Sequence, residues 1–136
     1  MSSPYRWGLR VYIEDTDAGG IVYYANYLKY AERARTEMLR AAGFAHGAIM
    51  AKERLFLAVR RCTVDYLRPA RLDDWLEIET TIASVRRASI AFEQKMRRGF
   101  EAIASLTLLI ACIGDDGKPH PLPAPLQSTL LTLVTA

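Results

Sequence analysis

The stretch of sequence that decides the fold reads EDTDAGGIVYYANYLKYAERARTEMLRAAG over residues 14–43. Its second part, from about Asn26 to Ala42, carries an apolar stripe at helical spacing. The stripe consists of Tyr27, Ala31, Ala34, Met38 and Ala42, with Leu28 and Leu39 beside it. We expect Asn26 to cap the N-terminus of this helix and Gly43 to follow its last turn. The pattern therefore predicts one long amphipathic helix.

Strand signals lie on both sides of this helix. Before it, apolar and polar residues alternate from Trp7 to Ile13, which is the period of a strand with one buried face. After it, residues 44–54 are expected to form a loop or a short second helix. Further strands are expected over residues 55–67, 76–82, 90–97 and 102–113. The last of these is apolar on both faces and should lie inside the sheet, and residues 126–134 should form a final helical turn or two.

The order of the elements is one strand, one long helix and then four strands, without internal repeats or a linker. Such an order predicts an α+β fold in which an antiparallel sheet of about five strands wraps the helix. Residues 1–136 are expected to form a single domain. An open sheet leaves edge strands that a second copy can cover, so we expect a homodimer or homotetramer.

The composition excludes several classes of protein. The chain has 136 residues, of which 51% are hydrophobic, and a formal net charge of +3. That mild basic excess suits an anionic small molecule about as well as nucleic acid. Since nucleic-acid binding would rest on this charge alone, we expect none. Cys62 and Cys112 lie in apolar, strand-like segments, so neither a disulfide framework nor a zinc site is predicted. With no signal peptide and no apolar run of roughly 20 residues, we expect a soluble, cytoplasmic protein without membrane insertion.

Reactive side chains gather in one segment, just before the helix. Glu14, Asp15 and Asp17 precede a pair of glycines. The N-terminal end of a helix has free N–H groups and a positive dipole, which suit an oxyanion or a polarised carbonyl. A carboxylate beside it can attack that carbonyl or take a proton from water. The same residues are typical of an ordinary turn; spacing alone favours the turn and leaves ester or thioester hydrolysis as the alternative.

A family resemblance favours the catalytic interpretation. Residues 15–27, DTDAGGIVYYANY, closely resemble the signature of hotdog-fold thioesterases of the 4-hydroxybenzoyl-CoA thioesterase group. Residues 31–39, AERARTEML, look like the branch associated with the Tol–Pal cell-envelope system, the YbgC-type acyl-CoA thioesterases. Residues 64–70, VDYLRPA, and the strand that contains Asp74 and Leu76 also match. The resemblance covers about Val11 to Ile113 and implies a hotdog fold that hydrolyses acyl-CoA.

The resemblance also implies roles for individual residues. Asp17 matches the catalytic carboxylate, which acts as nucleophile or general base, and the backbone N–H of Tyr24 matches the group that polarises the thioester carbonyl. Asp15 is expected to hold the turn through backbone bonds. Arg86 and Arg87 match a segment that binds coenzyme A phosphates, whereas the pairs Arg60-Arg61 and Arg97-Arg98 are interpreted as surface.

The acyl group and the partners stay open at this point. The Tol–Pal-associated branch often has histidine where this chain has Tyr24, and a tyrosine there is similar to the hydroxybenzoyl members. We expect a short aliphatic or aromatic acyl group, carried on coenzyme A or on acyl carrier protein. The resemblance places the active site at a subunit interface and implies no metal or organic cofactor, since coenzyme A is part of the substrate. His46 and His120 accompany no nucleophile motif, so a triad hydrolase is not expected. The alternative is a non-catalytic hotdog module that binds acyl-CoA or an envelope-assembly partner.

Overall fold

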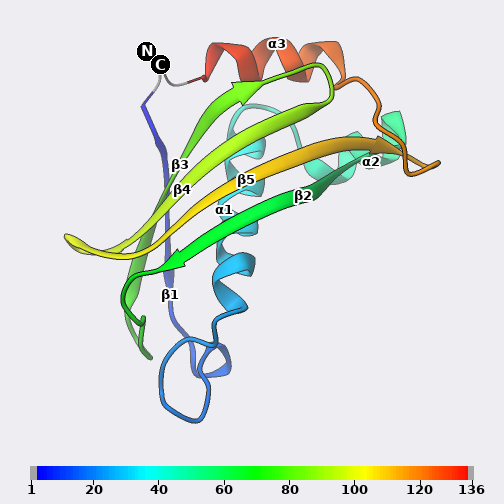
Figure 1. Cartoon of the computed structure of the whole chain (residues 1–136). Coiled ribbons are helices and arrows are strands. Elements are labelled where there is room, and N and C mark those ends of the chain that lie inside the picture. The colour runs from blue at the N-terminus through cyan, green and yellow to red at the C-terminus, as the bar shows by residue number, and fades with distance from the viewer. Residues whose placement is uncertain (1–2, 135–136) are drawn as a thin grey trace.

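The computed structural model describes residues 3–134. Its elements are β1 (Tyr5–Arg10), the 3-10 turn η1 (Ile13–Asp15), α1 (Asn26–Ala41), α2 (His46–Glu53), β2 (Leu55–Tyr66), β3 (Trp75–Val85), β4 (Ser89–Arg98), β5 (Glu101–Gly114) and α3 (Ala124–Thr132). The strands form one antiparallel sheet in the order β1-β3-β4-β5-β2, and α1 lies across one face of it (Figure 1). The predicted α+β architecture is confirmed; residues 1, 2, 135 and 136 of the predicted domain lie outside the described residues.

Helix α1 has the predicted length within one residue, but its start is built differently. Gly43 follows the last turn with a φ of +98°, so its predicted position is confirmed. The prediction that Asn26 caps the helix is wrong, because Ala25 is the capping residue and makes no side-chain cap. The side chain of Asn26, already helical, instead donates a 2.8 Å hydrogen bond to the carbonyl oxygen of Asp15. This bond ties the helix to the preceding loop.

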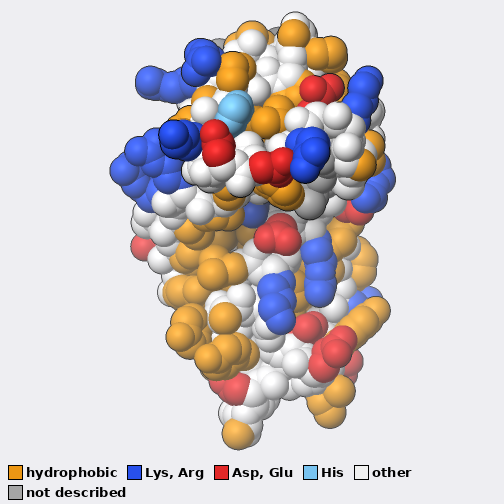
Figure 2. All heavy atoms as spheres, turned by 90° about the vertical axis from the view of Figure 1, so that its right-hand side faces the viewer, with side chains coloured by type: hydrophobic (Ala, Val, Ile, Leu, Met, Phe, Trp, Pro, Cys, Tyr) orange, Lys and Arg blue, Asp and Glu red, His pale blue; other side chains and the backbone are white. Residues whose placement is uncertain are grey.

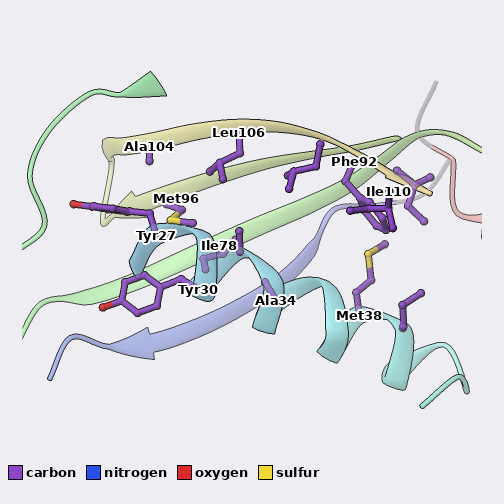
Figure 3. Packing of buried hydrophobic residues seen from close by; sticks show 14 of the residues in the cluster. Tyr27, Tyr30, Ala34, Met38, Ile78, Phe92, Met96, Ala104, Leu106 and Ile110 are labelled. Atoms are coloured by element: carbon purple, nitrogen blue, oxygen red, sulfur yellow. The ribbon is translucent and has the colours of Figure 1, made fainter. Parts of the chain in front are cut away.

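The core lies between α1 and the concave face of the sheet. Figure 3 shows Tyr27, Ala34 and Met38 of α1 facing apolar side chains of the strands. The buried strand residues include Leu76, Ile78, Ile82, Ile90, Phe92, Met96, Ala104, Leu106 and Ile110. The outward residues of β3 include the charged side chains Glu77 and Glu79, and Glu79 pairs there with Arg97 of β4. The predicted alternation of buried and outward residues is therefore confirmed.

The first strand is shorter than its alternation predicts. β1 ends at Arg10, and Ile13, expected on the buried face, is 76% exposed. The N–H of Tyr12 donates to the Asp15 carboxylate at 2.9 Å, and the N–H of Asp15 donates to the carbonyl oxygen of Tyr12 at 3.0 Å. These two bonds close the turn η1 and point Ile13 away from the core.

The remaining elements agree with the expected order. β5 lies between β4 and β2, as its two apolar faces predict. Residues 44–54 contain the short helix α2, and α3 is longer than the predicted turn or two. Within residues 3–134, no helix combines the length and the apolar character needed to cross a bilayer.

Candidate active site

The loop between β1 and α1 is organised around Asp15. The carboxylate of Asp15 accepts a hydrogen bond from the N–H of Tyr12. The backbone carbonyl oxygen of Asp15 accepts two more hydrogen bonds, from the N–H of Tyr23 at 2.9 Å and from the side chain of Asn26 at 2.8 Å. The expectation that Asp15 holds the turn is confirmed. Because its bonds reach both ends of the loop, the segment between them has little freedom to move.

Asp17 lies inside this loop, at the surface of the molecule. Its Oδ1 accepts a 2.8 Å hydrogen bond from the N–H of Gly19, and its backbone N–H donates to the carbonyl oxygen of Ile21 at 2.9 Å. A Cβ on Gly19 would lie 3.3 Å from Oδ1, so a larger residue at position 19 would press on the Asp17 carboxylate. Within residues 3–134, Oδ2 has no hydrogen-bond partner. Asp17 thus serves the turn with one oxygen and presents the other to solvent.

Tyr24 lies two residues before the first residue of α1, in the turn that leads into it. The carbonyl oxygen of Tyr23 accepts the N–H of Asn26 at 2.8 Å, and this bond begins the helical turn. In the described part of the chain, the N–H of Tyr24 donates to no acceptor. It is therefore a free donor at the positive end of α1, available to a ligand carbonyl.

The second motif, residues 64–70, lies against the first. The hydroxyl of Tyr66 donates to the carbonyl oxygen of Tyr24 at 3.1 Å. The N–H of the buried residue Ala70 donates to the Tyr27 hydroxyl at 3.0 Å, and its carbonyl oxygen accepts the N–H of Val22 at 2.8 Å. Two segments more than 40 positions apart thus hold the loop and the helix start together.

Asp74 fixes the end of this second motif. Its Oδ2 accepts hydrogen bonds from the N–H of Arg71 at 2.8 Å and from Nη1 of Arg98 at 2.6 Å. The interpretation of Arg97 and Arg98 as surface is wrong for Arg98, which is partly buried and also donates to the carbonyl oxygen of Pro69. Hydrogen bonds to Asp74 and Glu101 raise the pKa of Arg98.

Arg86 and Arg87 lie far from Asp17 in the same chain. They form the exposed tip of the hairpin between β3 and β4, where the N–H of Arg86 donates to the carbonyl oxygen of Ser89 at 2.8 Å. In the described residues neither guanidinium pairs with a carboxylate. The Asp17 loop contacts the turn before β3, and Arg86 follows the other end of that strand, roughly 30 Å away at the rise of a β-strand. One chain does not bring these groups together.

A cavity of about 290 Å³ lies between α1 and the sheet, and it is lined by one buried charged residue that was not predicted as a site residue. Arg35 lines this cavity and is only 7% exposed. The signal was available: Arg35 follows Ala31 by four positions and Tyr27 by eight, which places it on the apolar stripe.

Two further sites receive no support from the geometry. His120 contacts Asp116 in the turn after β5, with 3.2 Å between Nε2 and Oδ1, and no nucleophile accompanies it. Over residues 3–134, no group of three or more His, Cys, Asp or Glu side chains is placed to hold a metal ion.

Exposed apolar side chains surround the start of α1 and the end of β2. They are Tyr23, Tyr24, Leu28, Tyr66 and Leu67, each between 41% and 63% exposed. Figure 2, which views the molecule from the side, shows apolar side chains gathered along one flank. Patches of this kind mark sites of ligand or protein contact.

Comparison with known proteins finds similarity to thioesterases. The model of the thioesterase superfamily matches residues 19–104, a range that begins two residues after Asp17. The chain is 48% identical to the acyl-CoA thioester hydrolase YbgC of Escherichia coli over 121 residues, which are 88% of this chain and 90% of that protein. It is 40% identical to the acyl-CoA thioesterase YbgC of Haemophilus influenzae, over 92% of this chain and 91% of that one. The crystal structure of a probable thioesterase from Bartonella henselae has a TM-score of 0.86 at 36% identity and covers 89% of this chain and 100% of its own.

Proposed function

The chain belongs to the thioesterase superfamily and is a hotdog-fold thioester hydrolase, and on that premise we propose that it hydrolyses short-chain or aromatic acyl-CoA with Asp17 as its catalytic carboxylate. One observation carries this proposal. Among residues 3–134, one carboxylate oxygen of Asp17 has no partner and the backbone N–H of Tyr24 has no acceptor, and both groups belong to one tightly bonded loop at the start of α1. Thioester hydrolysis needs these two groups.

Asp17 acts on the thioester in one of two ways. As a nucleophile, its carboxylate bonds to the carbonyl carbon and expels the coenzyme A thiolate, and water then hydrolyses the mixed anhydride. As a general base, it takes a proton from water while the water oxygen bonds to the same carbon. Both routes end in the free acid and coenzyme A. The Oδ1 bond to Gly19 leaves Oδ2 available for either role.

The N–H of Tyr24 supports the negative charge that develops on the carbonyl oxygen. A donor fixed before the reaction begins contributes on the order of 3 kcal/mol to transition-state stabilisation. The dipole of α1 also stabilises this negative charge, since the positive end of the helix lies next to Tyr24. The phenol of Tyr24 has no hydrogen-bond partner in the described chain, so we assign the role to the backbone.

Two copies are needed for a complete site, and we expect them to pair through β2. This strand has twelve residues, and within residues 3–134 it pairs only with β5. A long unpaired edge is a template for another strand. In a two-fold dimer β2 pairs with its own copy in the antiparallel direction, so the Tyr66 end of one strand lies opposite the Leu55 end of the other.

That pairing unites groups that one chain keeps apart. Tyr24 contacts Tyr66 at the end of β2. The basic pair Arg86-Arg87 lies near the other end of this strand, because the nearby residue Ser89 is aligned across β5 with Ala58, near the start of β2. Each basic pair therefore lies at the end of the joined sheet where the other protomer has its Asp17. Arginine binds phosphate through paired charge-assisted bonds, and we assign Arg86 and Arg87 to the coenzyme A phosphates in this way.

Thiol release from a panel of acyl-CoAs tests the proposal. We expect wild type to hydrolyse at least one short aliphatic or aromatic thioester and Asp17→Asn to lose nearly all of that rate while still binding the thioester. The control is Asp73→Asn, since Asp73 is also exposed, its side chain has no partner among residues 3–134, and its φ of 69° suits asparagine. Equal rates for wild type and Asp17→Asn would remove Asp17 from the mechanism. No turnover by wild type on any thioester would favour the non-catalytic binding module.

A further inference from the structure

Arg35 is a charged residue in the core. It lies on the face of α1 that packs against the sheet and is 7% exposed. Arginine is almost never buried to this extent unless a partner balances its charge. The contacts of this guanidinium therefore show how its charge is accommodated in the core.

A chain of buried polar groups holds the guanidinium in place. Nη1 of Arg35 donates to Oε1 of Gln94 at 3.0 Å. The amide nitrogen of Gln94 donates in turn to the carbonyl oxygen of Ala31 at 2.9 Å and to Oγ1 of Thr80 at 3.0 Å. Gln94 and Thr80 are fully buried. Because both amide hydrogens of Gln94 are used, only its oxygen can face Arg35.

This network positions the charge without neutralising it. Within residues 3–134, Arg35 forms no ion pair, and its contact residue is glutamine, whereas glutamate would have balanced the charge. Burial lowers the pKa of Arg35, while the charge of Glu32, one helical turn away, raises it. Glu32 is exposed, and it also borders the cavity that Arg35 lines. A guanidinium has five N–H donors, and the one contact with Gln94 leaves most of them available.

The unused donors border the cavity of about 290 Å³. Its helix wall contains Arg35 and Thr36 together with the exposed acid Glu32, and its sheet wall contains Leu57, Phe92 and Ile110. Ligand pockets are mostly apolar with a few placed polar groups, and their volumes start at roughly 300 Å³. The cavity has this composition and this size. An apolar chain of a few carbons would contact the sheet wall while its polar end met the helix wall.

We propose that this cavity binds the acyl group of the substrate and that Arg35 makes it selective for a short acyl chain that ends in a carboxylate. The inference rests on the proposed thioesterase function and names its substrate class. Arginine matches a carboxylate because its planar fork can donate two parallel hydrogen bonds. Along α1 the cavity lies roughly 16 Å from Tyr24 at the rise of a helix. In the dimer that we propose, pairing through β2 brings Leu57, and with it the cavity, toward the thioester site of the partner subunit.

Succinyl-CoA and butyryl-CoA test the proposal, because their acyl groups have the same number of carbons and differ in the terminal carboxylate. We expect wild type to favour succinyl-CoA in kcat/KM by about tenfold or more, the range of a hydrogen bond to a charged group. Arg35→Met should remove this preference by lowering kcat/KM for succinyl-CoA far more than for butyryl-CoA. Arg35→Lys keeps the charge but loses the paired donors of the guanidinium, so its preference for succinyl-CoA should lie between those of wild type and Arg35→Met. The control is Arg33→Met, an exposed arginine on the same helix.

Each other outcome is decisive. If wild type prefers butyryl-CoA and Arg35→Met leaves the ratio unchanged, the carboxylate proposal is wrong while the thioesterase function stands. If Arg35→Met dissociates the dimer and slows both substrates equally, Arg35 pairs with an acid of a second copy, and the proposal is again wrong. If wild type hydrolyses neither thioester, calorimetric measurement of binding tests the carboxylate site separately from the thioesterase function. Tighter binding of succinyl-CoA that Arg35→Met abolishes supports the site without turnover, and equal binding of both thioesters contradicts it.

Discussion

The hydroxyl of Tyr66 donates a 3.1 Å hydrogen bond to the carbonyl oxygen of Tyr24, across 42 positions of the chain. The edge of the Tyr66 ring also contacts Tyr24 and Tyr27, with centroids 6.3 and 5.3 Å away. The peptide that follows Tyr24 is therefore held from the end of β2. The second motif thus acts on the helix start, which explains why both motifs occur together in this chain.

Loss of the Tyr66 hydroxyl should slow turnover more than it weakens binding. We expect Tyr66→Phe to lower kcat by roughly two- to tenfold, as for one neutral hydrogen bond, with KM nearly unchanged. The ring contacts remain, so the free energy of unfolding should change little. Tyr5→Phe removes a hydroxyl from β1 that makes no hydrogen bond in the described chain, and it should leave kcat unchanged. A rise in KM at constant kcat would show that Tyr66 binds substrate instead.

Mixed dimers should reveal that each active site uses two chains. Asp17→Asn lacks the carboxylate, and the double variant Arg86→Ala, Arg87→Ala lacks the phosphate contacts. In an equal mixture half of the dimers contain one chain of each kind, and each such dimer rebuilds one intact site from two. Activity at low substrate should therefore return to about a quarter of the wild-type value. No recovery after verified subunit exchange would place the basic pair in the same chain as its Asp17, or outside the site.

The ion pair between Asp74 and Arg98 should contribute measurably to stability. Its atoms lie 2.6 Å apart, and the side chains are only 21% and 26% exposed. Arg98→Met leaves the carboxylate with the N–H of Arg71 as its one remaining donor. We expect a loss of about 1–3 kcal/mol in the free energy of unfolding, measured in urea. The exposed pair between Arg40 and Glu37 serves as the control, and Arg40→Met should cost less than about 0.5 kcal/mol.

The two thiols should react slowly at neutral pH and at different rates. Burial raises the pKa of Cys112 and of Cys62, and the charge of Arg35 opposes the rise at Cys62. Because a raised pKa means less thiolate at any given pH, labelling should increase only in the alkaline range. Cys112 is fully buried and should label only on unfolding. Iodoacetamide labelling followed by mass spectrometry measures both rates.

The variant Arg35→Met adds a second readout to this experiment. Without the guanidinium, the pKa of Cys62 should rise further, and its labelling at a fixed pH should slow down. Labelling of Cys112 should not change, since Arg35 does not influence its pKa. Faster labelling of Cys62 in the variant would show that opening of the structure, rather than charge, controls its reactivity.

Much of the fold follows from local patterns. The alternation in β3 and β4 predicts their buried face, and the apolar stripe of α1 predicts most of its buried face, although it misses the buried residues Tyr30 and Arg35. Such patterns are predictable because a helix or a strand repeats its faces over a few residues. Ile13 and Asn26 were mispredicted for a related reason. Asp15 bonds to Tyr12 and Asn26, and these bonds override the periodicity and the capping preference.

The candidate site is only partly predictable in this way. The sequence by itself determined the α+β order, the position of Asp17 just before the helix and the resemblance of that loop to the thioesterases. Only the tertiary structure decided that Tyr66 and Ala70 hold the loop, that Arg86 and Arg87 lie at the far end of the sheet, and that Arg35 faces Gln94 inside the core. The physical reason is distance along the chain. Local periodicity sets which face of an element is buried, but the order of strands in the sheet sets which buried side chains meet.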